Sequence, residues 1–138
     1  VVVFTKYHTV CTYLCHEMEK SKIKYVSIQG HMSPKRRKDS INAFQHDNDI
    51  KVFLMTLKTA AVGITLTAAS TIVFMEPCHD FSIRKQAIGR IWRIGQTQSV
   101  RVVNMQTKNT IDTKNIDKLF QMCDGDVGSE EISGPINV

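Results

Sequence analysis

Two arginines and a glutamine in the second half of the chain have a spacing that suits phosphate chemistry. If their segment is helical, Gln86, Arg90 and Arg93 project within a sector of roughly 60°, because successive helical residues turn by about 100°. Guanidinium groups carry a fixed charge and present paired donors that match phosphate oxygens. We therefore predict that they bind a nucleotide phosphate. The alternative is a solvated basic helix face with ordinary surface salt bridges.

A helix from Phe81 to about Ile94 is expected to position these three side chains. Asp80 suits the N-cap of this helix, and Gly95 suits its end. The same helix would turn an apolar face to the protein, made by Ile83, Ala87, Ile91 and Ile94.

Strand and helix patterns alternate along the whole chain with short connections. Strands are predicted at residues 1–4, 25–28, 51–55, 71–75 and 100–105. Helices are predicted at 7–18, from Ser33-Pro34 to 44, at 59–66, at 81–94 and after Thr110, the last with a stripe of Ile116, Leu119, Phe120 and Cys123. This order predicts an α/β fold with an open, mostly parallel sheet and helices on both faces. Ligands bind such sheets at the carboxyl ends of the strands.

Composition and charge favour one domain that binds a polyanion. The 138 residues are 42% hydrophobic and 22% charged, which excludes disorder or a coiled coil for the whole chain. Residues 1–123 hold all 18 basic side chains and nine acidic ones, whereas residues 124–138 hold four acids and no base. We predict a basic domain at 1–123, suited to nucleic acid or nucleotide, and a flexible acidic tail at 124–138.

Membrane and metal functions are not expected. The longest apolar-leaning stretch, Ala60 to Pro77, is interrupted by polar residues and is no membrane span. The cysteines form no C-x-x-C pair, which favours reduced thiols over the alternative of a zinc site at His8, Cys11, Cys15 and His16. The chain lacks an initiator methionine, and we expect it to be a piece of a longer protein.

The string QAIGRIWRIGQ at 86–96 resembles motif VI of the superfamily-two helicases, specifically the SWI/SNF-type remodelling and repair ATPases. Other segments fall in that family's order: 1–7 resembles motif IV, 26–44 the Gly-plus-Arg segment, 53–77 motif V and its following strand, and 109–119 the closing Thr-Ile-Glu helix. The resemblance covers about residues 1 to 123. It implies the C-terminal RecA-like lobe, which lacks its own P-loop. The pairing of Ala-Ala-Ser70 with motif VI is similar to the SHPRH-like repair branch.

The resemblance implies roles for individual residues. Arg93 and Arg90 match the catalytic arginine fingers that approach the γ-phosphate of ATP, with Gln86 and Gly63 also at the nucleotide. The residues that match DNA contacts are Thr5, Lys6, Arg37, Lys58 and Thr59. The implied cofactor is ATP with Mg²⁺, held mainly by a first lobe of the same chain. The implied partners are duplex DNA and nucleosomes, and the implied location is the nucleus. No protein metal site and no membrane are expected.

This chain departs from the family pattern at several positions. Ala60-Ala61 stands where the family usually has paired glycines, and Gly63-Ile64-Thr65-Leu66 where it has Gly-Leu-Asn-Leu. Cys78-His79-Asp80 replaces a Trp-Asn-Pro sequence that touches DNA, and Trp92, which we expect to pack against the neighbouring lobe or a helix, replaces a frequent histidine. A degenerate lobe that binds DNA or a partner without turnover therefore stays an alternative, as does an RNA helicase lobe.

Two further patterns limit the interpretation. In the run Lys35-Arg36-Arg37-Lys38, only Arg37 aligns with the family's arginine, and a solvated face or a localisation signal explains the rest equally well. The sequence also contains no G-x-x-x-x-G-K-[ST] loop and no acidic metal-binding box after a strand. We therefore expect that residues 1–138 alone do not hydrolyse ATP.

Overall fold

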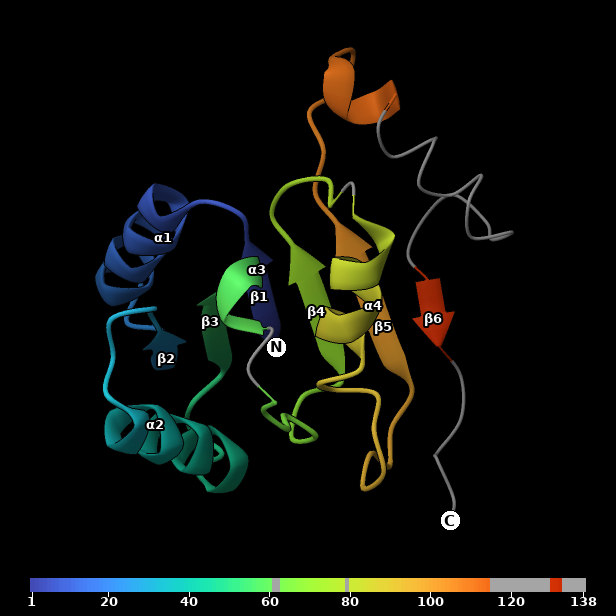
Figure 1. The fold of residues 1–138 in the computed structure, drawn as a ribbon. Helices are drawn as coiled ribbons and strands as arrows, with labels where there is room; N and C mark the ends of the chain where they lie inside the picture. Colours follow the sequence, from blue (N-terminus) through green and yellow to red (C-terminus); the bar gives the residue numbers. More distant parts are fainter. Residues whose placement is uncertain (61–62, 79, 115–129, 133–138) are drawn as a thin grey trace.

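A six-stranded sheet forms the centre of the molecule (Figure 1). The computed structural model describes residues 1–60, 63–78 and 80–114, and the backbone of 130–132. The strand order is β2-β3-β1-β4-β5-β6, in which the first five strands are parallel and β6 is antiparallel to β5. The strands are β1 (Val2–Thr5), β2 (Tyr25–Ile28), β3 (Val52–Thr56), β4 (Thr71–Phe74), β5 (Val100–Asn104) and β6 (Glu130–Ile132). The prediction of an open, mostly parallel sheet is confirmed, and the five expected strands lie within one residue of their predicted bounds.

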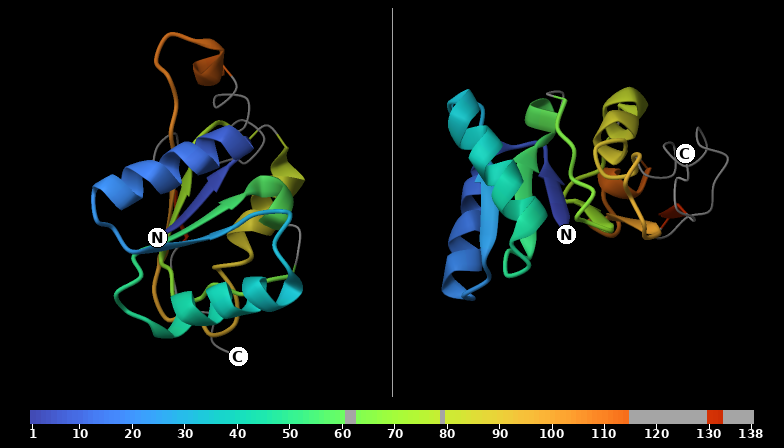
Figure 2. Two further views of the ribbon diagram at one scale, coloured as in Figure 1. Left: turned by 90° about the vertical axis from the view of Figure 1, so that its left-hand side faces the viewer. Right: turned by 90° about the horizontal axis from the view of Figure 1, so that it is seen from below.

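Helices cover both faces of the sheet, as predicted (Figure 2). Of the helices α1 to α4, one lies on one face and three lie on the other. The first is α1 (His8–Lys20), and the three opposite it are α2 (Pro34–His46), α3 (Leu57–Ala60) and α4 (Phe81–Ile88). The arrangement is a RecA-like α/β fold.

Alternating strand residues build the two apolar layers. Val2 and Phe4 of β1 belong to the larger core beneath α2, α3 and α4, whereas Val3 packs with Cys11 of α1 and Leu54 of β3 on the other face. This alternation follows from the two-residue period of a strand, in which successive side chains point to opposite faces. Because helices cover the sheet on both faces of β1, all four of its side chains are buried, which explains its continuous apolar sequence.

Two helix starts follow the predicted caps. The Ser33 side chain accepts a hydrogen bond from the Arg36 N–H at 3.4 Å, and Pro34 occupies the first turn of α2. The Asp80 carboxylate accepts the N–H groups of Ser82 and Ile83 at 2.9 and 3.1 Å at the start of α4. These caps satisfy amides that have no partner inside the helix.

The end of α4 contradicts the prediction. The helix ends at Ile88, and residues 89–95 form successive turns instead of continuing to Ile94. The carbonyl of Arg90, which a continuing helix would pair with Ile94, instead accepts the Leu66 N–H at 2.8 Å. Gly95 then adopts a φ of 98°, a conformation that ordinary residues avoid. A hydrogen bond from Leu66 therefore takes the place of the next hydrogen bond within the helix.

The apolar face expected on this segment is also partly wrong. Ala87 and Ile91 are fully buried, but Ile83 is 40% and Ile94 66% exposed, while Ile88 is buried instead. The expected short helix at 59–66 likewise begins earlier and is shorter, since α3 covers only Leu57–Ala60.

The C-terminal part of the chain is only partly described. The segment predicted as a flexible acidic tail, residues 124–138, contains β6, whose backbone pairs with β5. The other residues of that tail lie outside the described ranges, so the domain boundary stays a prediction. Residues 111–114 are helical, and the Thr110 hydroxyl accepts the Asp112 N–H at 3.2 Å. The predicted stripe from Ile116 to Cys123 lies outside the described residues.

Within the described residues, none of the helices is both long and apolar enough to cross a membrane. In that same part of the chain, no three histidine, cysteine or acidic side chains lie close enough together to hold a metal ion.

Candidate functional site

The segment with the two arginines, residues 89–96, is bound to the loop at residues 63–70, and we call these the arginine segment and the 63–70 loop. The Leu66 N–H donates to the Arg90 carbonyl at 2.8 Å, and Arg93 Nη1 donates to Thr65 Oγ1 at 3.3 Å. The 63–70 loop lies between α3 and β4, and the arginine segment lies between α4 and β5. The helices α3 and α4 lie on the same face of the sheet (Figure 1). The structure therefore brings the predicted motif V and motif VI segments together. The motif VI segment is not one continuous helix, because α4 ends at Ile88.

Gln96 is the buried centre of this connection, and the sequence analysis assigned it no role. Its side chain is 3% exposed, and its amide nitrogen lies 2.7 Å from the Ala69 carbonyl and 3.2 Å from that of Thr67. Its amide oxygen accepts the Gln98 N–H at 3.0 Å. These bonds satisfy backbone groups that the interior would otherwise leave unpaired. Gln96 therefore determines how the arginine segment lies on the 63–70 loop.

A second glutamine holds the 63–70 loop from α2. The Ala68 N–H donates to Gln45 Oε1 at 2.8 Å, and Gln45 Nε2 donates to the Thr65 carbonyl at 3.3 Å. Between α2 and the loop lies an open groove of about 580 Å³, with Ile41 and His46 on one side and Gly63 on the other. No sequence periodicity distinguishes Gln45 from other polar residues of α2, so tertiary structure was needed to find it.

Arg90 and Arg93 occupy different environments. Arg90 is half-buried, and its Nε donates to the carbonyl of Ala60, the last residue of α3, at 3.0 Å. Arg93 is exposed, and Thr65 holds one nitrogen of its guanidinium. Gln86 is exposed on α4. The three side chains therefore come from a helix and two successive turns, and the exposed cation of the pair is Arg93.

Among the described residues, no neighbour gives Gly63 a steric reason to be glycine. Its φ lies in the ordinary range, and a Cβ built on it would meet no atom within 4 Å. The residue is also exposed. Glycine permits close approach of another molecule to the backbone, and this is consistent with the predicted contact to a nucleotide.

Two of the predicted DNA contacts, Thr5 and Lys6, end and follow β1, and of these two only Lys6 is at the surface. Thr5 is fully buried, and its hydroxyl donates to Glu76 Oε1 at 2.7 Å. The Thr5 side chain thus forms a hydrogen bond inside the protein and is not at the surface, where a phosphate would bind. Lys6 is exposed, and its ammonium lies 5.6 Å from the centroid of the Tyr7 ring.

The predicted contacts after β3 divide in the same way. Lys58 is exposed on α3, but Thr59 is 6% exposed and shares a 2.8 Å hydrogen bond with the Thr56 hydroxyl. Arg37 is half-buried in the first turns of α2. The side chains available to a DNA phosphate from this set are Lys6, Lys58 and the accessible part of Arg37.

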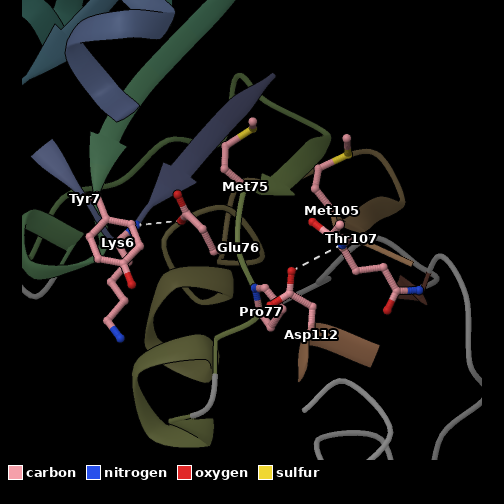
Figure 3. A pocket seen from close by; sticks show the side chains of 9 residues that line it. Lys6, Tyr7, Met75, Glu76, Pro77, Met105, Thr107 and Asp112 are labelled. Atoms are coloured by element: carbon pink, nitrogen blue, oxygen red, sulfur yellow. Dashed lines mark hydrogen bonds between the residues drawn. The ribbon is translucent and has the colours of Figure 1, made fainter. Parts of the chain in front are cut away.

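A pocket of about 390 Å³ lies beside Lys6 at the carboxyl ends of β1, β4 and β5 (Figure 3). Glu76 and Asp112 bring carboxylates to it, and both are bonded to backbone amides, to the Lys6 N–H at 2.8 Å and the Thr107 N–H at 3.2 Å. The rest of its lining consists of Tyr7, Met75, Pro77, Met105, Gln106 and Thr107.

The Cys-His-Asp departure contributes to the core and to a helix cap. Cys78 is buried, and Asp80 caps α4, while His79 lies outside the described residues. Burial raises the pKa of the Cys78 thiol, although a hydrogen bond with the Asp80 backbone and the nearby Arg84 charge oppose that rise. Arg84 is 2% exposed with its guanidinium 5.3 Å from the Phe74 ring centroid, a buried cation that the sequence analysis did not single out.

Comparison with known proteins places the chain in a family. Residues 1–95 match the family described as "Helicase conserved C-terminal domain". The chain is 32% identical to the "ATP-dependent helicase rhp16" of Schizosaccharomyces pombe over 94% of its own length and 15% of that protein. It is 33% identical to the "Chromatin-remodeling ATPase INO80" of Arabidopsis thaliana over 88% of its length and 8% of that protein.

A solved structure agrees with this placement. The C-terminal part of the Fun30 ATPase domain superposes with a TM-score of 0.80 at 25% identity, over 86% of this chain and 38% of that one. The chain therefore spans only a small part of the relatives it matches. The chain belongs to the helicase conserved C-terminal domain family and is the C-terminal RecA-like lobe of a SWI/SNF-type ATPase of superfamily two.

Proposed function

We propose that the chain is the second lobe of a DNA-dependent ATPase that moves along duplex DNA in the nucleus, and that it supplies arginine fingers and part of the DNA-binding track. Relatives named as a chromatin-remodelling ATPase and as the "DNA repair protein rad8" of Schizosaccharomyces pombe support work in remodelling or repair. Nucleosomes are then a natural form of the DNA substrate. The SHPRH-like branch remains a prediction from motif similarity.

The observation that carries the proposal is the position of Arg93. Its guanidinium is exposed, yet its backbone is fixed by the bonds of Arg90 and Gln96 to the 63–70 loop. A charge that is preorganised and open to a ligand stabilises negative charge that develops during phosphoryl transfer. Arg93 is therefore the proposed arginine finger. Arg90 is half-buried and hydrogen-bonded to the Ala60 carbonyl, and we assign it a second contact with the same phosphate.

The residues on this lobe suit part of an ATP site. Gly63 leaves open space for a close approach to its backbone, and Arg93 offers a cation nearby in the chain. ATP with Mg²⁺ supplies the transferable γ-phosphoryl group. Since the described residues contain no cluster of three ligating side chains, we assign the metal to the first lobe of the same chain. Closure of the two lobes then brings Arg93 to the phosphate.

The proposed DNA track follows the carboxyl ends of the strands. Lys6 after β1, Lys58 after β3 and Arg37 on α2 are the basic side chains assigned to it. Phosphate contacts of this kind position a protein on DNA without reading its sequence.

The test is Arg93→Ala in the full-length protein. We expect DNA-stimulated ATPase to fall by about 10³-fold, because the finger stabilises only the transition state, while DNA affinity stays within twofold. The matched control is Arg101→Ala, which removes an exposed arginine from β5 and should leave the rate unchanged. Equal rates for wild type and Arg93→Ala would refute the role of Arg93.

The same assay decides between the alternatives. A full-length protein that binds duplex DNA but hydrolyses no ATP would be a degenerate, non-catalytic lobe. Stimulation by RNA in preference to duplex DNA would indicate an RNA helicase. We expect stimulation by duplex DNA.

A further inference from the structure

Glu76 connects the ends of two strands at the edge where we propose that DNA binds. It follows β4, and its two carboxylate oxygens accept hydrogen bonds from the residues that end and follow β1. Oε1 accepts the Thr5 hydroxyl at 2.7 Å, and Oε2 accepts the Lys6 N–H at 2.8 Å. Hydrogen bonds to an ionised acceptor are roughly twice as strong as neutral ones, and both distances are in the short range typical of that class.

The turn after β1 is ordered through these bonds. The Thr5 hydroxyl oxygen also accepts the Tyr7 N–H at 3.2 Å, so one fully buried hydroxyl links Glu76 to the start of α1. The Met75 N–H donates to the Phe4 carbonyl at 2.9 Å and continues the β1–β4 pairing up to this point. The backbone of Lys6 is thus held from both sides.

The carboxylate does not neutralise the ammonium group of Lys6. Among the described residues, Lys6 forms no ion pair, and its ammonium lies over the Tyr7 ring. Figure 3 shows the Glu76 carboxylate directed at the Lys6 backbone nitrogen, with the lysine side chain extending away from it. The Glu76 carboxylate therefore accepts hydrogen bonds from a backbone amide and a hydroxyl, and the Lys6 ammonium group stays available to an external anion.

We propose that Glu76 is a positioning residue for DNA binding, which fixes the turn at residues 5–7 so that Lys6 presents its ammonium to a DNA phosphate. This inference rests on the proposed DNA track. An acid on a DNA-binding edge would ordinarily weaken binding by repulsion. Here its removal should weaken the contact made by Lys6, which is the opposite sign.

The test is a double-mutant cycle in the full-length protein with Lys6→Ala, Glu76→Gln and the double variant. The readout is the dependence of duplex-DNA affinity on salt concentration. Lys6→Ala should flatten the log–log slope by roughly one unit. Glu76→Gln should flatten it by a similar amount when Lys6 is present, because a carboxamide cannot accept both bonds, and by nothing further when Lys6 is alanine.

Controls separate positioning from charge and from folding. Glu17→Gln removes an exposed acid that pairs with Lys20, and it should leave the slope unchanged. Thermal unfolding reports the stability of each variant. If Glu76→Gln does not fold, Thr5→Val, which keeps the buried shape but removes the hydroxyl, should flatten the slope in the same direction.

Each result has one interpretation. Losses from Lys6→Ala and Glu76→Gln that simply add, or an unchanged slope in Glu76→Gln, would overturn the positioning role while the DNA track stands. An unchanged slope in Lys6→Ala would overturn the contact at Lys6 and the inference with it. No affinity for duplex DNA in the wild-type protein would refute the proposed function itself.

Discussion

Arg90 and Arg93 are three residues apart, yet their side chains lie in different surroundings. Arg90 contacts a buried carbonyl at Ala60, and Arg93 contacts a hydroxyl at the surface. Sequence spacing assigned them a shared direction on the assumption of a continuous helix. Because their segment consists of turns, the backbone bonds of the 63–70 loop determine the direction of each side chain instead.

Gly63 provides a prediction at the scale of single residues. Gly63→Ala should leave stability unchanged or raise it by up to about 1 kcal/mol, because its conformation suits alanine and the unfolded chain loses freedom. If the backbone there approaches a nucleotide, the added methyl group should lower DNA-stimulated ATPase about tenfold. Thermal unfolding and phosphate release measure the two effects. The control is Gly30→Ala, where a Cβ also meets nothing within 4 Å. Full activity of Gly63→Ala would contradict close approach of the nucleotide.

Among the elements, the packing of α1 against the sheet buries a titratable group, the thiol of Cys11. Cys11 is fully buried between α1 and the sheet, with Leu14 and Cys15 packed beside it. The helix predicted at residues 7–18 is thus confirmed, with bounds of His8–Lys20. Burial raises the pKa of the Cys11 thiol from 9.0 to about 11, and the neighbouring Cys15 adds to this rise.

The raised pKa predicts an alkaline loss of stability. The unfolded chain releases the Cys11 proton near pH 9, while the folded chain keeps it until about pH 11. The free energy of unfolding should therefore be unaffected by this group below pH 9 and should fall by at most about 3 kcal/mol as the pH rises above it. Denaturant unfolding at several pH values measures the fall. Cys11→Ala should show a shallower decline, and identical declines in both proteins would contradict the assignment.

In the molecule as a whole, the two ion pairs formed among the described residues lie away from the proposed DNA track. Lys24, before β2, pairs with Asp49 at 2.6 Å, and Lys20, at the end of α1, pairs with Glu17 at 2.9 Å. Both lie toward the amino ends of the strands. Lys6 and Lys58, which follow the carboxyl ends of β1 and β3, form no ion pair among the described residues, so their charges are available to an external anion.

This distribution predicts salt-dependent binding of the full-length protein to duplex DNA. Arg37→Ala and Lys58→Ala should each flatten the log–log salt slope by roughly one unit, since each contact releases about one counterion. Lys24→Ala is the matched control, because that lysine is exposed but paired at the opposite edge. Fluorescence anisotropy with a labelled duplex measures the slopes. A slope that changes as much in Lys24→Ala would indicate a diffuse charge effect and no defined track.

Patterns in the sequence alone predict the order and approximate bounds of the five parallel strands, the caps at Ser33 and Asp80, and the helix at 7–18. These features depend on patterns within a few residues, such as β-branched runs and side chains that satisfy neighbouring amides. The family motifs also lie in these segments, and the comparisons confirmed the family.

Long-range contacts in the folded chain determine three other features. These are the end of α4, the hydrogen-bond partner of Thr5, and the residues that bind the 63–70 loop. The Arg90 carbonyl bonds with Leu66, and the Thr5 hydroxyl bonds with Glu76, 71 residues away along the chain. Gln45 and Gln96 likewise bind Ala68 and Ala69 of the 63–70 loop, 23 and 27 residues away along the chain. Such bonds compete with local preferences and depend on which segments the folded sheet brings together, so no local pattern in the sequence contains them.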